Sequence, residues 1–259
     1  MDNDRKLLVD TISTAFKEPL SCYFSSSQSN VELLSSVLQI PSSGSVYPRL
    51  GSHRFEYTVE YKDGIGFIDC ETKKPTSFNF TKSYEEDILI HHGCGGGILS
   101  FEAFSFLQFN TLMLSRIQVL FNSIPKPYCS LHLRGTDGLG TNFEPLIDHL
   151  ESLPSQQFFV ATDSRRLLEI VKTRLSKHRL ISYSAASIEV DDPLHVFMEN
   201  DPRTHDRARI NGNTIIDLGL LALADKYYYV DPELYGGWVS GFSRLAKFLH
   251  SNKKYLLPV

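Results

Sequence analysis

An apolar run gives way to a polar, glycine-rich loop in the stretch Tyr128-Cys-Ser-Leu-His132-Leu-Arg134-Gly-Thr-Asp137-Gly-Leu-Gly-Thr141. The apolar half predicts a buried strand over 128–133. Downstream, further strands and helices are predicted in alternation, with strands over 157–161, 179–183 and 227–230, and helices over 144–153, 164–177, 213–224 and 240–250. This alternation is typical of an α/β fold in which helices cover both faces of a parallel sheet. Because such sheets bind ligands at the carboxyl ends of their strands, we expect function in the loops that follow them.

The N-terminal half predicts a less regular set of elements. These are helices over 4–17 and 31–38, a hairpin around an Asp-Gly turn over 54–70, a strand over 87–90 and a long apolar helix over 100–121. The glycine-rich loop Gly95, Gly96 and Gly97 precedes the long helix. Two prolines follow that helix, and we predict an N-terminal lobe over 1–124 and a C-terminal lobe over 125–259.

Composition excludes several classes of protein. The chain has 259 residues, of which 42% are hydrophobic and 22% charged, as expected for a globular protein rather than a disordered one. A net charge of −4 argues against nucleic-acid binding by charge alone. The 4 cysteines form no Cys-x-x-Cys pair, which disfavours a structural zinc site or a disulfide scaffold. The N-terminus lacks the apolar core of a signal peptide, and no apolar stretch reaches the ~18 residues that a membrane span needs, so we expect a cytoplasmic protein.

Two of the predicted strand-end loops carry candidate anion-binding groups. In the first, His132 and Arg134 stand among glycines, where backbone N–H groups and a planar guanidinium can approach an anion together. The alternative is a turn in which Asp137 caps the next helix. In the second, a strand runs into Thr162, Asp163 and a serine, which predicts a helix N-terminus facing the same cleft. Capping alone also explains that triplet.

Two later loops complete the pattern. Asp217 lies among apolar residues, where a carboxylate is costly to bury unless a donor pairs with it. The partner could be a nucleobase that offers two N–H groups, or Arg207 or Arg209. Ser240 and Gly241 follow a glycine-rich turn and begin a predicted helix, which is either a further anion-binding terminus or an ordinary serine cap.

These four segments, in this order, resemble the donor-binding half of the fucosyltransferases, above all the core α1,6-fucosyltransferases and the bacterial nodulation fucosyltransferases. The family motif His-Val-Arg-Arg-Thr-Asp-Lys-Val-Gly-Thr is matched by His132-Leu-Arg-Gly-Thr-Asp-Gly-Leu-Gly-Thr141. An Ala-Thr-Asp triplet, an Asp followed by a helix ending in Ala-Asp, and a Ser four residues before an Arg are matched at Asp163, Asp217 and Ser240. The resemblance covers roughly residues 128–250.

The resemblance implies a fold and an activity. The fold is a GT-B glycosyltransferase fold of two Rossmann-like lobes, with the C-terminal lobe holding the nucleotide sugar and the N-terminal lobe on the acceptor side. The activity is transfer of a sugar, with GDP-fucose as the first expectation, to a glycan hydroxyl, without a metal or other cofactor. No nucleic-acid partner is implied.

The resemblance also implies residue roles. Arg134 binds the donor diphosphate with Ser240, Gly241 and the helix behind them. His132 and Asp217 contact guanine. Further donor contacts are expected from Thr162, Asp163 and Arg209, while Gly95, Gly96 and Gly97 line the donor or acceptor site.

Two departures from the family pattern bear on these residue roles. Gly135 replaces the second arginine, whose contact Arg207 or Arg209 could supply instead. Asn142 stands where the family carries a glutamate proposed as the base, which leaves Asp137, Glu144 or a residue of the first lobe to take the acceptor proton.

Other functions remain open on the sequence alone. The same fold could use a UDP-sugar such as UDP-xylose, or bind a sugar nucleotide or glycan without catalysis. A hydrolase is disfavoured because Ser240 lacks the glycines of a nucleophile elbow. A metal at His91, His92 and Cys94 is disfavoured because adjacent strand residues point to opposite faces.

Overall fold

The computed structural model describes residues 7–9, 18–35, 45–47, 59–62, 66–69, 73, 82–89, 98–135, 142–183, 206–236 and 239–257. Its contacts divide the chain into two units, one formed by Met1–Val37 and Phe101–Val259 and the other by Leu38–Ser100. The predicted lobes, 1–124 and 125–259, stay a prediction. None of the helices in the described ranges has the length and apolar character needed to cross a bilayer.

The larger unit is built on a parallel sheet of 4 strands in the order β11-β10-β9-β12. The strands are β9 (Cys129–Leu133), β10 (Gln157–Thr162), β11 (Arg179–Ile181) and β12 (Lys226–Tyr229). Thr162 pairs with Leu133 and Tyr229 pairs with His132, so the carboxyl ends of three strands lie at one edge. The predicted parallel sheet is therefore confirmed, with boundaries that differ from the prediction by one or two residues.

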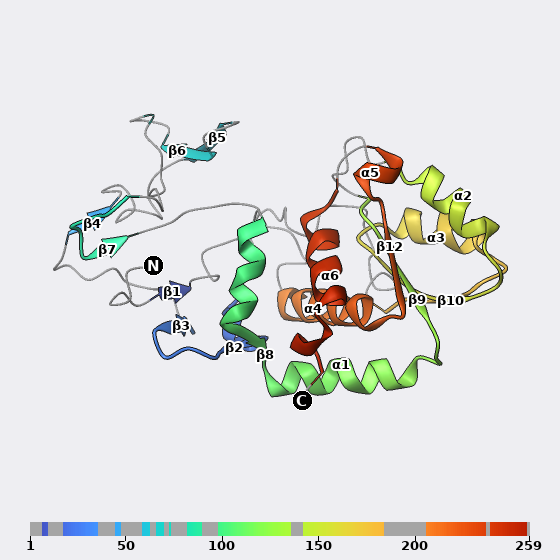
Figure 1. Cartoon of the computed structure of the whole chain (residues 1–259), viewed down its shortest axis with the longest axis horizontal. Helices are drawn as coiled ribbons and strands as arrows, with labels where there is room; N and C mark the ends of the chain where they lie inside the picture. The colour runs from blue at the N-terminus through green and yellow to red at the C-terminus, as the bar shows by residue number, and fades with distance from the viewer. Residues whose placement is uncertain are drawn as a thin grey trace. The chain divides into compact units, whose positions relative to one another are not determined.

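Helices cover both faces of this sheet (Figure 1). One face carries α1 (Thr111–Ser123), α4 (Arg207–Leu223) and α6 (Gly241–Ser251), and the other carries α2 (Glu144–Ser152) and α3 (Arg165–Arg174). Alternation along β9 explains the division, because Leu131 and Leu133 pack on the side of α2 and α3. Ser130 points the other way, and its Oγ donates to the carbonyl oxygen of Leu221 in α4 at 2.8 Å.

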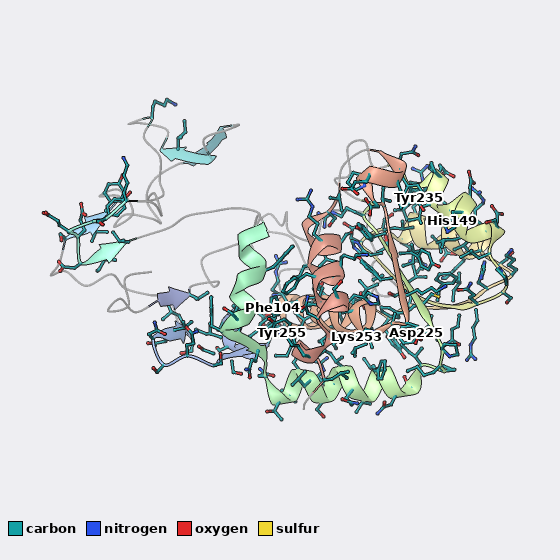
Figure 2. The ribbon with its side chains drawn as sticks, viewed as in Figure 1. Phe104, His149, Asp225, Tyr235, Lys253 and Tyr255 are labelled. Carbon is teal, nitrogen blue, oxygen red and sulfur yellow. The ribbon has the colours of Figure 1, made fainter. Side chains whose placement is uncertain are left out.

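The C-terminal segment packs on the side of the sheet that α4 covers and contacts the end of that helix. The short helices α5 (Pro232–Tyr235) and η6 (Lys253–Tyr255) flank α6. Lys253 Nζ donates to the carbonyl oxygens of Leu223 and Ala224 at 3.3 and 2.6 Å, where α4 ends (Figure 2). A lysine at the C-terminus of a helix satisfies exposed carbonyls and complements the negative end of the helix dipole.

The N-terminal segment forms short strands, so the helices predicted over 4–17 and 31–38 are wrong at the residues the structure describes. β1 (Leu7–Val9) pairs in parallel with β3 (Val31–Leu33), and η1 (Leu20–Cys22) leads into β2 (Phe24–Ser26). Short apolar runs have no periodicity that distinguishes a strand from a helix, and here strand pairing settles the structure.

The single long helix predicted over 100–121 is interrupted, and only its second half is α-helical. The segment contains η3 (Ile98–Ser105), β8 (Leu107–Phe109), which pairs antiparallel with β2, and α1. Asn110 causes the break, because its side chain accepts from the N–H of Met113 at 2.9 Å and caps α1. Pairing of β8 with β2 places the ring centroids of Phe24 and Phe109 4.9 Å apart, and this aromatic contact stabilises the extended backbone of β8.

The smaller unit contains two small sheets within its described residues. β5 (Val59–Lys62) and β6 (Gly66–Asp69) form the predicted antiparallel hairpin. β4 (Val46–Tyr47) pairs in parallel with β7 (Ile88–Leu89), which confirms a strand in the predicted range 87–90. The glycine-rich loop of residues 95–97 lies outside the described residues.

Candidate active site

Arg134 and Asp163 form an ion pair at the carboxyl edge of the sheet. Arg134 directly follows β9, and Asp163 directly follows the neighbouring β10. Arg134 Nε lies 3.0 Å from Asp163 Oδ2, and the N–H of Gly135 donates to Asp163 Oδ1 at 2.7 Å. The carboxylate is only 6% exposed and the arginine side chain 19%. Asp163 thus fixes the direction of Arg134 by binding both its side chain and the next peptide.

Gly135 allows these two loops to approach each other. A Cβ at this position would lie 2.4 Å from Cβ of Ser164 and 2.7 Å from Cδ1 of Leu167. Real Cβ atoms do not approach each other so closely, so any side chain here must displace the turn after β10. The second arginine of the family motif has no room at this position in this chain.

The turn after β10 forms the predicted helix cap. Thr162 Oγ1 accepts from the N–H of Ser164 at 3.2 Å, and Ser164 Oγ accepts from the N–H of Leu167 at 3.1 Å. These bonds begin α3 beside the Arg134–Asp163 pair. Thr162 is therefore engaged in the turn, and its predicted contact with the donor stays a prediction.

His132 is held against α6. Its Nδ1 lies 2.6 Å from Ser243 Oγ, and its ring centroid lies 4.9 Å from that of Phe242. Burial, and secondarily the positive charge of Arg134, lowers the pKa of His132 to about 3. The imidazole is therefore neutral at pH 7, with one ring nitrogen engaged by Ser243.

The first turn of α6 contains both contacts of His132, Phe242 and Ser243, and also Gly241, which is exposed. Ser240 Oγ accepts from the N–H of Phe242 at 3.2 Å, so Ser240 is the predicted cap of this helix. Among the residues that the structure describes, none has an atom within 4 Å of a Cβ placed at Gly241. The positive end of the helix dipole is thus accessible to an anion at this point.

Asp217 lies deeper in its helix than the sequence predicts. α4 begins at Arg207 rather than at 213, so Asp217 is in its third turn. Contacts with the N-terminal segment explain the early start, because Asn211 Nδ2 donates to Glu18 Oε2 at 2.7 Å and Tyr23 OH donates to the carbonyl oxygen of Ala208 at 3.2 Å. Asp217 is 4% exposed and lines a groove of about 430 Å³ between α1 and α4.

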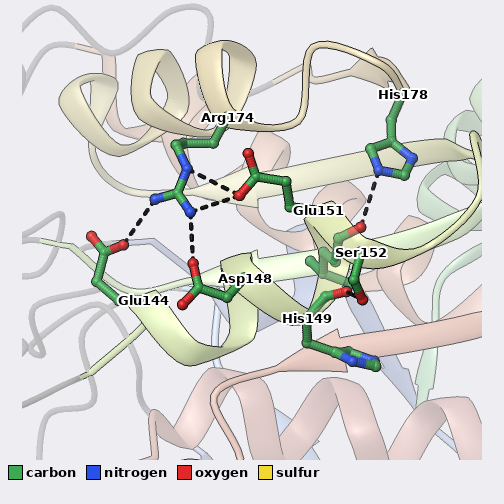
Figure 3. A network of polar contacts seen from close by, with 8 residues as sticks. Glu144, Asp148, His149, Glu151, Ser152, Arg174 and His178 are labelled. Carbon is green, nitrogen blue, oxygen red and sulfur yellow. Dashed lines mark hydrogen bonds and ion pairs between the residues drawn. The ribbon is translucent and has the colours of Figure 1, made fainter.

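The remaining candidates lie in different surroundings. Arg209 is exposed and pairs with Asp206 one turn earlier. Glu144 pairs with Arg174 at 3.1 Å, in a cluster where the same guanidinium also holds Asp148 and Glu151 and joins α2 to α3 (Figure 3). Asp137 lies outside the described residues.

Three residues near these groups carry no signal in the sequence. Ser243 follows Ser240 in what reads as an ordinary helix, while Arg116 and Tyr183 belong to segments predicted as core elements. Only the packing of distant elements brings Ser243 to His132, and Arg116 and Tyr183 to the groove of Asp217. Among the described residues, no three His, Cys, Asp or Glu side chains gather as metal ligands would. The expectation that no metal is needed stays a prediction.

Comparison with known proteins identifies the fold. No protein family and no curated protein matches the chain. Solved structures do match, among them NodZ α1,6-fucosyltransferase crystallised with GDP, at 13% identity and a TM-score of 0.55 over 95% of this chain and 82% of that one. The same enzyme soaked with GDP-fucose has 17% identity and a TM-score of 0.57, and fucosyltransferase NodZ from Bradyrhizobium 17% and 0.58, each over 95% of this chain and 83% of theirs. The chain therefore has the α/β fold of these fucosyltransferases.

Proposed function

We propose that this protein is a glycosyltransferase that moves a sugar from a GDP-sugar, with GDP-fucose as the first choice, to a glycan hydroxyl. The observation that carries the proposal is the ion pair of Arg134 with Asp163 at the carboxyl edge of a sheet whose fold is that of a fucosyltransferase. In an α/β sheet this edge is the expected place for a ligand. The planar guanidinium of an arginine is the side chain best suited to binding a diphosphate there.

The donor diphosphate is proposed to lie between Arg134 and the N-terminus of α6. Ser240 caps that helix and Gly241 in its first turn is exposed, and the backbone dipole there and the guanidinium both favour negative charge. Both groups stabilise the charge that develops on the diphosphate as the bond to the sugar breaks. The chain's own residues then supply the leaving-group stabilisation.

The reaction is proposed to be a single inverting displacement. The acceptor oxygen attacks the anomeric carbon, the bond from that carbon to the diphosphate oxygen breaks, and a carboxylate takes the hydroxyl proton. Asp137 and Glu144 are the two proposed bases. Glu144 is held by Arg174, so its use as a base needs a shift away from that partner. Measuring turnover of Asp137→Asn and Glu144→Gln separately tells them apart.

The first experiment is thermal unfolding with GDP, UDP, GDP-fucose and UDP-xylose, each with and without a chelator. A ligand that binds the folded state raises the melting temperature by mass action. We expect a shift with GDP and GDP-fucose that the chelator leaves unchanged. A shift with UDP alone would replace the donor class, and a chelator-sensitive shift would contradict metal independence.

Transfer itself needs a second measurement. Release of GDP from GDP-fucose that depends on added glycan acceptor supports the enzyme. Binding of the donor without turnover across a panel of acceptors favours a binding protein that uses the same site.

A further inference from the structure

The side chains of His132 and Ser243 form a buried polar pair where the end of β9 meets the first turn of α6. The two residues are 6% and 4% exposed, and His132 Nδ1 lies 2.6 Å from Ser243 Oγ. The ring of Phe242 contacts the imidazole, with centroids 4.9 Å apart. The backbone of Ser243 is also held, because Tyr227 OH donates to its carbonyl oxygen at 3.2 Å. These contacts fix the orientation of the imidazole.

The hydrogen bond between the two side chains has one direction that leaves no buried proton unsatisfied. A serine hydroxyl carries one proton, and a neutral imidazole carries one proton on either Nδ1 or Nε2. If Nδ1–H donated to Ser243, the hydroxyl proton would need an acceptor of its own. Within the described residues, the Ser243 side chain has His132 as its one hydrogen-bond partner, and no backbone carbonyl accepts from it. A buried hydroxyl without an acceptor is costly, so Ser243 donates to Nδ1.

Donation from Ser243 fixes the tautomer of His132. Nδ1 uses its lone pair to accept, so the single proton of the neutral ring is on Nε2. The ring is neutral at pH 7 because burial lowers its pKa to about 3. Nε2 is consequently a hydrogen-bond donor, and among the described residues it has no acceptor.

The Nε2–H group belongs to the same edge of the sheet as Arg134. His132 is the last residue but one of β9, and Arg134 follows two residues later, which continues the alternation on one side of the strand. The positive charge of Arg134 acts on the imidazole and is the second cause of its low pKa. The edge thus presents a neutral N–H donor beside a charged one. A nucleoside diphosphate, which is rich in acceptor oxygens, matches such a pair.

We propose that Ser243 is a positioning residue that acts through His132. By donating to Nδ1 it keeps the ring proton on Nε2, and the Nε2–H group donates to an acceptor atom of the bound nucleotide. His132 then meets an oxygen or a bare ring nitrogen of the ligand and not one of its N–H groups. The resemblance to the fucosyltransferases gives Ser243 no role. The inference rests on the proposed function for its ligand, whereas the tautomer is a property of the chain alone.

NMR spectroscopy of the ligand-free protein tests the tautomer directly. Long-range proton–nitrogen correlation spectra distinguish a protonated ring nitrogen from a bare one by its chemical shift, and their cross-peak pattern distinguishes Nδ1 from Nε2. The chain has 9 histidines, and the signals of His132 are those that disappear in His132→Gln. We expect the proton on Nε2 at pH 7. A proton on Nδ1 overturns the proposal.

Removal of the Ser243 hydroxyl tests the positioning role. In Ser243→Ala either ring nitrogen can carry the proton, so the spectrum should show an Nδ1–H form that the wild type lacks. Isothermal titration calorimetry should show GDP binding about three- to tenfold more weakly, as expected for the loss of one hydrogen bond. Equal GDP affinity in the wild type and the variant overturns the role of Ser243.

Ser130→Ala is the matched control. Ser130 is also buried on β9, and its Oγ donates to the carbonyl oxygen of Leu221 in α4 at 2.8 Å. The control therefore removes a comparable hydrogen bond between strand and helix without removing a partner of His132. It should leave the tautomer and the GDP affinity unchanged. An equal loss of affinity in Ser130→Ala and Ser243→Ala would trace the effect to general destabilisation and overturn the positioning role.

Two amides at position 132 keep the inference testable if Ser243→Ala fails to fold. Glutamine places its NH₂ group near the position of Nε2, and asparagine places its own near that of Nδ1. His132→Gln should therefore retain more GDP affinity than His132→Asn. The reverse order overturns the assignment of Nε2–H as the donor to the nucleotide.

The failure of this inference differs from that of the proposed function. If the wild type binds GDP but carries the His132 proton on Nδ1, the inference is overturned and the glycosyltransferase proposal stands. If the wild type binds no nucleoside diphosphate, the proposed function is overturned together with the donation to a nucleotide, whichever tautomer the spectrum shows.

Discussion

Asp163 binds the Arg134 side chain with one oxygen and the Gly135 peptide with the other. We predict that Arg134→Ala abolishes transfer, with turnover at least about a hundredfold lower, because a positioned donor to the developing charge is lost. The fold should persist, since Asp163 keeps its bond to the Gly135 N–H. Initial rates and circular dichroism of the purified variant test both statements. Turnover near that of the wild type contradicts the assignment of Arg134.

Because His132 is buried, its titration makes the free energy of unfolding depend on pH. Burial holds its pKa near 3 in the folded chain, against an ordinary value of about 6.5. Below pH 6.5 the unfolded chain therefore binds a proton that the folded chain does not. Stability from this group is complete above pH 6.5 and declines by up to about 1.4 kcal/mol per pH unit down to about pH 3.

Since the contribution of His132 to stability declines as the pH falls, a variant without this imidazole should be less sensitive to acid. Between pH 7 and pH 5, the free energy of unfolding should fall less in His132→Gln than in the wild type, as measured by urea titration. Burial also lowers the pKa of His178 and His250, so the variant should keep part of the pH dependence. Identical losses in the two proteins would mean that His132 takes up its proton in the folded state.

At the scale of elements, Gly219 allows α1 and α4 to meet. A Cβ at Gly219 would lie 2.7 Å from Cδ1 and 2.9 Å from Cγ2 of Ile117, which is fully buried in α1. Helices approach this closely only where one of them lacks a side chain. The separation of the two helices in turn sets the width of the groove that contains Asp217.

Gly219→Ala is therefore predicted to destabilise the protein by about 1–3 kcal/mol, through overpacking against Ile117. Ile117→Ala makes room for the new methyl group, so the double variant should lose less than the sum of the two single losses. Chemical denaturation measures all three, with Gly241→Ala as a control whose new methyl group contacts none of the described residues. Simple additivity would show that the two residues do not limit the helix spacing.

The elements of the second half are more predictable from the sequence than those of the first half, for a physical reason. In the second half, β9 and β10 are buried on both faces, and α2 and α3 each have one buried apolar stripe. These patterns are distinct, and both β10 and α3 are correctly predicted. In the first half, apart from the β5–β6 hairpin, strands of two or three residues pair with partners that are distant in the sequence. Their local pattern does not contain that information, and β1 and β3 were consequently predicted as helices.

In the candidate site, residues at strand ends are likewise predictable from the sequence, and long-range contacts are not. His132, Arg134 and Asp163 are predictable because each follows or ends a strand, and parallel strands finish at one edge. The contact of His132 with Ser243 spans 111 residues and depends on how α6 packs. The start of α4 was predicted too late because the contacts at Asn211 and Ala208 come from residues 18–23.

At the scale of the larger unit, one core joins early and late parts of the chain. Tyr23 and Leu256 belong to the same buried cluster, and the rings of Phe104 and Tyr255 lie 5.8 Å apart (Figure 2). The single proton of Tyr23 OH is shared between Glu18 Oε2 at 2.6 Å and the Ala208 carbonyl oxygen at 3.2 Å. The N-terminal segment is thus part of the core and of the support for α4.

Removal of the Tyr23 hydroxyl tests whether the N-terminal segment supports α4. Tyr23→Phe leaves the ring in place but deprives Glu18 and the carbonyl of Ala208 of a donor, so we expect a loss of about 1–2 kcal/mol. Denaturation followed by tyrosine fluorescence and by circular dichroism should give one shared transition at lower denaturant. Two separate transitions would show that the N-terminal segment unfolds independently of the sheet.

The core shared by Tyr23 and Leu256 also has a consequence for biosynthesis. Translation adds about 5–20 residues per second, so residue 23 emerges from the ribosome on the order of ten seconds or more before residue 256. During that interval Phe24, Phe104 and Phe109 lack the partners contributed by α6 and the residues after it. The nascent chain therefore carries an exposed aromatic surface for most of its synthesis, and that surface is a natural ligand for chaperones until the last helix has emerged.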